Sequence, residues 1–104
     1  QVQVNLQVIA NVIDYQMNVQ ESIEAPRWSS KPGTAPREEN DPYELWLENR
    51  IPENVRRQLA AKGHNVKVAE AWSFGGSQAI LMDQKNRVFM GGADPRRDGY
   101  TIGW

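Results

Sequence analysis

The acidic and basic residues near the end of the chain are the first candidates for a binding or catalytic role. Arg96 and Arg97 follow Asp94 in "MGGADPRRDG", and a guanidinium fork matches the two oxygens of a carboxylate. The same arginines are equally well placed to pair with Asp94, with Asp98 or with an acidic partner surface. The segment therefore has two interpretations, a clamp for a carboxylate ligand and a set of structural ion pairs.

Metal and acid–base chemistry have weaker support. His64 is the only histidine, and it follows the glycine that closes an expected helix. A surface imidazole near the negative end of a helix explains this position better than a catalytic or metal-binding role. Asp83, Asp94 and Asp98 carry oxygen ligands for a hard cation, but their spacing does not match a calcium loop and turn residues flank each of them. We expect no metal site and no cofactor.

Serine, glycine and tryptophan residues also have simple structural explanations. Ser73 and Ser77 have no base nearby in the sequence, and isolated serines in turns are seldom nucleophiles. Two glycine pairs lie beside strand-like runs, which favours close packing or a bulge over an anion-binding loop. The tryptophans are widely spaced, which indicates a core or an interface. These glycines and tryptophans are Gly75, Gly76, Gly91, Gly92, Trp28, Trp46, Trp72 and Trp104.

Composition excludes several classes of protein. The 12 basic and 13 acidic residues give a net charge of −1 without long runs of one sign, so nucleic-acid binding is not indicated. The absence of cysteine rules out a disulfide framework and a thiolate nucleophile. The apolar runs are too short to span a bilayer, and the first residues lack the pattern of an export signal. A chain of 104 residues suits one domain.

The first segment, "QVQVNLQVIANVIDYQM", fits two periodicities. Residues 1–8 alternate as in a strand, whereas Leu6, Ile9, Ile13 and Met17 lie at the spacing of one helical stripe. Val8, Ala10 and Val12 widen the face that this helix is expected to bury. The longer pattern favours a helix over about residues 5–15, with only "QVQV" as an extended approach.

The next segment contains a strong local signal. Asn18 and Glu21 have the spacing of a capping box, which predicts a short helix over residues 19–24 that Pro26 ends. Residues 29–42 hold three prolines, a glycine and mixed charges, a composition typical of an exposed loop.

The rest of the chain predicts one helix and four strands. "YELWLEN" alternates as a strand, and "IPENVRRQLAAKG" predicts a helix with Pro52 in its first turn and Gly63 at its end. "NVKVAEAW", "SQAILMD" and "RVFMGG" predict three strands, of which the last two flank a hairpin turn. This order predicts an α+β fold in which helices cover one face of a largely antiparallel sheet.

Several of these motifs together carry a resemblance to a known family. "NLQVIANVIDYQMNVQESIEAPRW" and "SQAILMDQKNRVFMGGADPRRDGYTIGW", with "LWLE" and "AKGHNV" between them, resemble the end of the small subunit of the γ-glutamyltransferase (γ-glutamyltranspeptidase) family. The resemblance implies that residues 1–104 are a single C-terminal fragment of an N-terminal nucleophile (Ntn) hydrolase domain. That fold is a four-layer αββα sandwich.

The resemblance also implies a reaction. The family's precursor cuts itself before a threonine, which attacks a γ-glutamyl amide such as glutathione, and the threonine's own amine can act as base. The acyl group then passes to water, an amino acid or a peptide. In the family the threonine, the residues that hold the glutamate and the oxyanion-hole glycines all precede the stretch that matches Gln1, so no catalytic role is assigned to Gly75, Gly76, Gly91 or Gly92.

The implied partners are the rest of the precursor and a small γ-glutamyl substrate. We expect the missing N-terminal part of the small subunit and the large subunit to complete the enzyme, and this chain by itself to be inactive. Gln16 stands where the family commonly has glycine, and residues 29–42 form a longer excursion than expected. A related amide or acyl substrate and a non-catalytic interaction module therefore stay open. The family is often periplasmic or secreted, but this sequence predicts no compartment.

Overall fold

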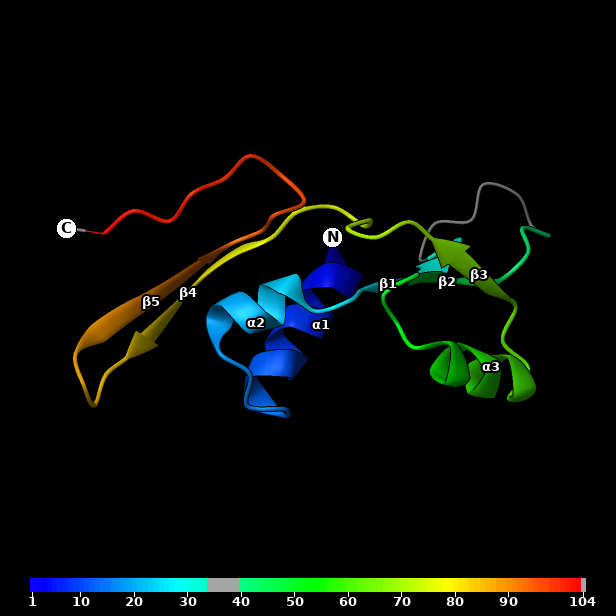
Figure 1. Ribbon diagram of the computed structural model, residues 1–104, viewed down its shortest axis with the longest axis horizontal. Coiled ribbons are helices and arrows are strands. Elements are labelled where there is room, and N and C mark those ends of the chain that lie inside the picture. The colour runs from blue at the N-terminus through cyan, green and yellow to red at the C-terminus, as the bar shows by residue number, and fades with distance from the viewer. Residues whose placement is uncertain (34–39, 104) are drawn as a thin grey trace. The chain divides into compact units, whose positions relative to one another are not determined.

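The computed structural model describes residues 1–33 and 40–103. They form two compact units, which Figure 1 shows with their elements. The hairpin unit consists of Gln1–Ala25 and Gly75–Trp104, and the sheet unit consists of Pro26–Phe74. Each unit has its own helices and strands.

The first helix of the hairpin unit, α1, spans Val2–Ile13. The prediction of an extended "QVQV" is wrong, because the N–H of Asn5 donates to the carbonyl of Gln1 at 3.1 Å and the helical ladder begins there. Once a first helical turn exists, each added residue contributes a backbone hydrogen bond. The helix therefore includes the first residues, although their alternation of polar and apolar side chains is typical of a strand. The helix ends at Ile13, slightly before the predicted end at about residue 15. Gln16 follows with a φ of 55°, a left-handed conformation that ends helices.

The second helix, α2, spans Val19–Glu24 and confirms the predicted capping box. The Asn18 side chain accepts the N–H of Glu21 at 2.9 Å, and the Glu21 carboxylate accepts the N–H of Asn18 at 3.0 Å. Ala25 leaves the helical region with a ψ of 144°, as expected for a residue before Pro26. Local sequence thus determines both ends of this helix.

The strands of the hairpin unit are β4, Gln78–Asp83, and β5, Val88–Ala93. They pair antiparallel in register from Gln78 with Ala93 to Asp83 with Val88, which confirms the predicted hairpin. α2 packs against both strands. The core of the unit consists of Val8, Val19 and Ile23, with Ala79 packed against them.

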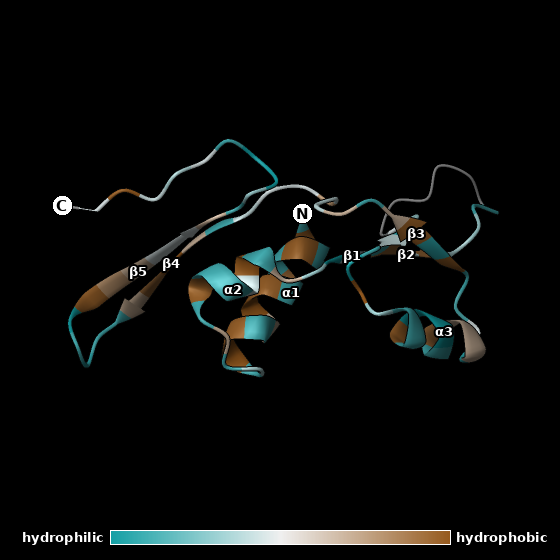
Figure 2. Ribbon diagram, viewed as in Figure 1, coloured by the Kyte–Doolittle hydropathy of each residue, from teal (hydrophilic) through white to brown (hydrophobic). Residues whose placement is uncertain are grey.

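Only part of the expected buried face of α1 is buried in this chain. Leu6, Ile9 and Ile13 are 58%, 55% and 69% exposed, whereas Val8 is only 6% exposed. α2 contacts α1 on the Val8 side, where the Ser22 hydroxyl donates to the Val8 carbonyl at 2.7 Å. Leu6, Ile9 and Ile13 therefore form an uncovered apolar surface of this chain, whereas Val8 lies on the buried side. Figure 2 shows that α1 is apolar in several of its turns.

The sheet unit contains three strands in the order β1-β2-β3. β1, Trp28–Lys31, pairs antiparallel with β2, Glu44–Glu48, and β2 pairs parallel with β3, Val66–Ala69. A parallel pair needs a crossover connection, which α3, Glu53–Ala61, supplies. Two antiparallel pairings and one parallel pairing, with helices packed on the strands, confirm the α+β class.

Two further predictions concern this unit. The helix after Pro52 is confirmed, and Gly63 follows it with a φ of 97°, a conformation that glycine adopts easily. The exposed loop predicted at 29–42 begins too early, because residues 29–31 belong to β1. Strand pairing uses backbone groups, so a serine-rich segment without an apolar pattern still joins the sheet. Residues 34–39 of that loop lie outside the described residues.

Candidate functional site

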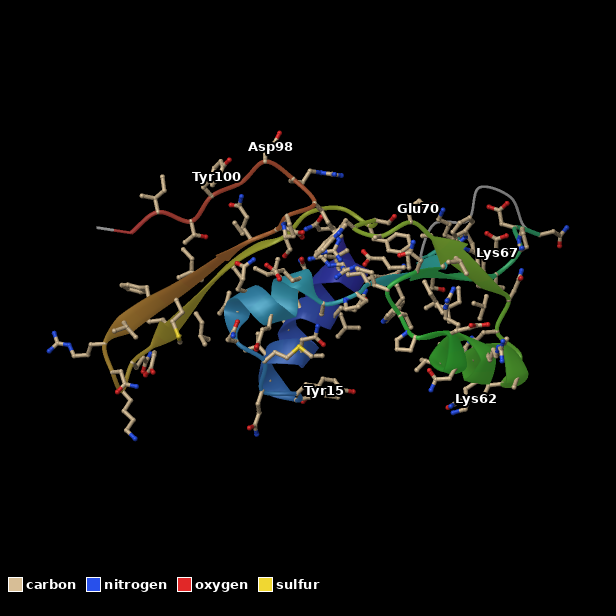
Figure 3. All side chains as sticks on the ribbon, in the orientation of Figure 1. Tyr15, Lys62, Lys67, Glu70, Asp98 and Tyr100 are labelled. Atoms are coloured by element: carbon tan, nitrogen blue, oxygen red, sulfur yellow. The ribbon has the colours of Figure 1, made fainter. Side chains whose placement is uncertain are left out.

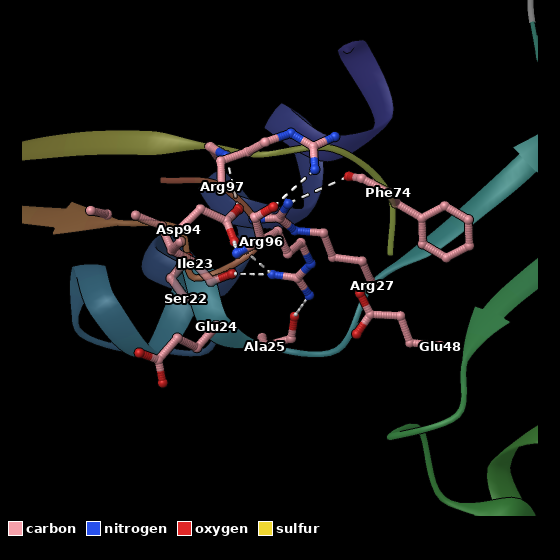
Figure 4. Close-up of polar contacts among 12 residues, drawn as sticks. Ser22, Ile23, Glu24, Ala25, Arg27, Glu48, Phe74, Asp94, Arg96 and Arg97 are labelled. Carbon is pink, nitrogen blue, oxygen red and sulfur yellow. Dashed lines mark hydrogen bonds and ion pairs between the residues drawn. The ribbon is translucent and has the colours of Figure 1, made fainter. Parts of the chain in front are cut away.

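A buried ion pair lies at the centre of the polar contacts in the hairpin unit. Nη1 of Arg96 is 3.1 Å from Oδ1 of Asp94, and the two side chains are 0% and 1% exposed. The same carboxylate accepts the N–H of Arg96 at 3.0 Å and that of Ser77 at 2.8 Å. Arg96 also donates to the carbonyls of Ile23 and Ala25 at 3.0 and 3.1 Å (Figure 4). Arg96 is therefore a structural residue that joins the end of α2 to the segments flanking the hairpin.

Arg97 differs from Arg96 in exposure and in partners. It is exposed, and its Nη1 donates to the carbonyl of Arg96 at 2.8 Å (Figure 4). Its stem lies against Gly76, where an added Cβ would be 2.5 Å from Cγ of Arg97. Close packing thus explains Gly76, as predicted, and Gly75 has a φ of 75°, a conformation that glycine adopts easily.

The structure brings Gly76 of the first glycine pair and Arg97 of the arginine pair together around one pocket. Pairing of Gln78 with Ala93 places the residue before β4 next to the segment after β5. The pocket has a volume of about 300 Å³ and is lined by Gly76, Ser77, Gln78, Asp94 and Arg97. The two motifs are about twenty residues apart in the sequence, and only the register of the hairpin shows that they meet.

The second glycine pair has a packing role, as predicted. A Cβ on Gly92 would lie 2.8 Å from Cδ1 of Ile23 and 2.9 Å from Cγ1 of Val19. A Cβ on Gly91 would clash with the methyl group of Thr101. The absence of side chains here lets α2 approach one face of the hairpin and the chain end approach the other.

Asp83 and Asp98 both lie in or beside turns, as the sequence predicted. The carboxylate of Asp83 accepts the backbone N–H of Asn86 at 3.0 Å and its side-chain amide at 2.7 Å, which confirms the turn interpretation. These hydrogen bonds, the backbone one first, lower the pKa of Asp83. Asp98 is exposed and points away from the hairpin, near Tyr100 on the chain after β5 (Figure 3).

His64 lies at the end of α3 and is exposed, as predicted. It lines a pocket of about 600 Å³ in the sheet unit, together with residues that include Trp28, Leu47 and Leu59. Within residues 1–33 and 40–103, no three His, Cys, Asp or Glu side chains gather closely enough to hold a metal ion. The predicted absence of a metal site remains a prediction.

The tryptophans and Ser73 take part in local structure. Trp46 donates to the Glu44 carboxylate at 2.7 Å, and Lys31 lies over its ring at 4.6 Å. The guanidinium of Arg50 lies 3.7 Å from the ring centre of Trp72. These contacts depend on strand pairing and loop geometry, so sequence patterns did not show them. The Ser73 hydroxyl donates to the Glu70 carbonyl at 2.8 Å, and Trp104 lies outside the described residues.

Among the described residues, no helix has both the length and the apolar character that crossing a membrane requires.

The fold defines the class of protein. Cephalosporin acylase from Bacillus halodurans has a similar structure, with a TM-score of 0.80 and 29% sequence identity over 97% of this chain and 17% of that one. The helices and strands described above are thus part of an Ntn-hydrolase fold, as predicted.

The family is equally clear. The model of the gamma-glutamyltranspeptidase family matches residues 1–104, so the chain belongs to that family. The acylase ACY 1 proenzyme of Pseudomonas sp. (strain V22) is 38% identical over 97 residues, which are 93% of this chain and 15% of the acylase. The glutathione hydrolase-like YwrD proenzyme of Bacillus subtilis (strain 168) is 33% identical over 106 residues, which are 99% of this chain and 19% of that protein. The chain therefore spans less than a fifth of the length of these two relatives.

Proposed function

We propose that this chain is the C-terminal portion of the small subunit of a γ-glutamyltransferase-like enzyme. The enzyme cleaves γ-glutamyl amides such as glutathione and transfers the acyl group to water, an amino acid or a peptide. The nucleophile in this proposal is a threonine outside the chain, activated by its own amine. The family match over residues 1–104 carries the proposal, and the proenzyme relatives, each much longer than this chain, support a role within a larger precursor.

In this proposal the chain supplies structural layers rather than reacting groups. Register places Met82 opposite Phe89 on the face of the hairpin that does not meet α2. Ile80, Met82 and Phe89 are 73%, 59% and 71% exposed on that face, and Figure 2 shows the brown colour along the hairpin. Strands that are apolar on both faces are usually covered on both. We assign that cover to the remainder of the same precursor.

A second substrate class has specific support. The ACY 1 relative is more similar in sequence than YwrD, at 38% against 33%, and an acylase is the structural neighbour with a TM-score of 0.80. The chain also has Gln16 in the left-handed region, at a position where glycine is expected in the γ-glutamyl enzymes. The alternative is therefore an amidohydrolase that removes a different acyl group.

A substrate panel on the full-length protein separates the two. The purified, processed protein is offered γ-glutamyl p-nitroanilide, glutathione and a set of amides with other acyl groups, and kcat/KM is measured for each. We expect the γ-glutamyl compounds to be preferred. A preference for another acyl group would replace the γ-glutamyl assignment with the acylase one, and no turnover of any amide by a correctly processed protein would support a non-catalytic module.

A further inference from the structure

We propose that the pocket beside Arg97 is a binding site for a small carboxylate, separate from the chemistry proposed above. The pocket lies between the segment before β4 and the segment after β5, both in the hairpin unit. Nothing in the proposed reaction uses these residues. The inference rests on three observations, which concern charge, unused donors and the fixed position of Arg97.

The charged residues that line the pocket are one carboxylate, Asp94, and one guanidinium, Arg97. The Asp94 carboxylate is paired with the buried guanidinium of Arg96 at 3.1 Å and accepts two backbone N–H groups as well. That carboxylate is therefore already satisfied. Arg97 makes no ion pair within the residues that the structure describes, so its charge is the uncompensated one beside the pocket.

Several hydrogen-bond donors around the pocket are available to a ligand. Among the described residues, Arg97 uses only Nη1, toward the carbonyl of Arg96 at 2.8 Å. Its Nε and Nη2 groups, the N–H of Gly76 and the side-chain amide of Gln78 make no hydrogen bond there. A guanidinium fork binds a carboxylate through two parallel hydrogen bonds, and an amide donor nearby adds a third.

The position of Arg97 is fixed by its stem. Cγ and Cβ of Arg97 approach Gly76 so closely that an added Cβ would lie 2.5 and 3.3 Å from them. The hydrogen bond to the Arg96 carbonyl fixes the guanidinium end. Holding a long side chain in place before binding reduces the entropy lost when the ligand arrives. Gly76 is then needed both for close packing and for this preorganisation.

The size of the pocket limits the ligand. Its volume is about 300 Å³, at the lower end of the range for small-molecule sites. A short-chain organic acid fits this space, and its carboxylate would face Arg97. The structure thus indicates a monocarboxylate of a few carbon atoms.

The test uses the full-length protein and propionate as the probe. Saturation-transfer NMR gives the dissociation constant at fixed ionic strength, with chloride as the competing anion. We expect Arg97→Gln to weaken propionate binding by about tenfold or more, and Arg97→Lys, which keeps the charge but loses the fork, by about fivefold. Gly76→Ala should also weaken binding, because the new methyl group displaces the Arg97 stem.

Arg87→Gln is the matched control. Arg87 is another exposed arginine of the hairpin unit, and it lies in the turn between β4 and β5. This variant should bind propionate as the unmodified protein does, and the three arginine variants should have unchanged melting temperatures within a few degrees. Equal binding by the Arg97→Gln and Arg87→Gln variants, or no binding of propionate at all, would overturn the proposal.

Discussion

Asp94 is the residue on which the polar contacts of the hairpin unit depend. Replacing it with asparagine leaves Arg96 charged, buried and without its ion-pair partner. Because an uncompensated buried charge is costly, we expect Asp94→Asn to lower the free energy of unfolding by about 3–5 kcal/mol. Urea denaturation of the full-length protein measures the change. Asp98→Asn is the control, since Asp98 is exposed and its replacement should have an effect within about 0.5 kcal/mol.

Gln16 provides a second prediction at the scale of one residue. Its φ of 55° costs a residue with a Cβ roughly 1 kcal/mol relative to glycine. Gln16→Gly should therefore raise the melting temperature slightly, and Gln16→Val should lower it because a β-branched residue tolerates this conformation poorly. A lower melting temperature for the glycine variant would show that the Gln16 side chain makes a stabilising contact.

Single residues were partly predictable from sequence. The turn role of Asp83 follows from its neighbours alone, because its partner Asn86 is three residues away. The choice between a clamp and an ion pair at Arg96 was not predictable. It depends on the carbonyls of Ile23 and Ala25, about seventy residues earlier in the chain.

At the scale of elements, Gly92 controls how closely α2 lies against the hairpin. Gly92→Ala would place a methyl group 2.8 Å from Ile23 and 2.9 Å from Val19. Overpacking of this kind typically costs about 1–3 kcal/mol, so the melting temperature should fall. Gly103→Ala is the control, because nothing lies within 4 Å of an added Cβ there. Equal melting temperatures for the two variants would contradict the packing described for α2.

The hairpin turn gives a prediction about pH. Hydrogen bonds from Asn86 lower the pKa of Asp83, so the folded hairpin favours the ionised carboxylate. A depressed pKa contributes stability above the ordinary pKa of aspartate, and that contribution is lost as the pH falls through the folded value. Asn86→Ala removes the side-chain hydrogen bond and should raise the pKa of Asp83 toward its ordinary value. An NMR titration of the carboxyl carbon measures the pKa, and an unchanged value would contradict this account.

Sequence predicted elements well where the determining contacts are local. The ends of α2 follow from Asn18, Glu21 and Pro26, and the β4–β5 hairpin follows from two apolar runs around a polar turn. β1 was missed because its Ser29 and Ser30 carry no apolar pattern and its pairing depends on β2. The buried face of α1 was predicted too broadly because several sides of the helix are apolar, and only the position of α2 selects the side with Val8.

At the scale of the whole molecule, the exposed apolar face of the hairpin should be essential in the complete protein. Phe89 is 71% exposed in this chain and is covered by the rest of the precursor in our proposal. Phe89→Asp would bury a charge there, so the full-length variant should mature poorly and accumulate as uncleaved or aggregated precursor. Lys85→Asp, in the hairpin turn, should mature normally. Normal maturation of the Phe89 variant would show that this face stays exposed.

This chain expressed by itself should expose the same apolar surfaces. Leu6, Ile9 and Ile13 on α1 and Ile80, Met82 and Phe89 on the hairpin leave a large apolar area uncovered, and such areas promote association. We expect the 104-residue product to aggregate or to need a partner. A cooperative thermal transition of a monomer, seen by calorimetry and ultracentrifugation, would instead favour an independent interaction module.

In the proposed function, this chain works within a precursor that cuts itself to free a threonine nucleophile. The most direct test is to purify the full-length protein, determine the first residue and mass of the polypeptide that contains this chain, and assay the same sample with γ-glutamyl p-nitroanilide. We predict a shortened polypeptide that begins with threonine and releases nitroaniline. An uncut precursor with an intact threonine and no turnover would contradict the account.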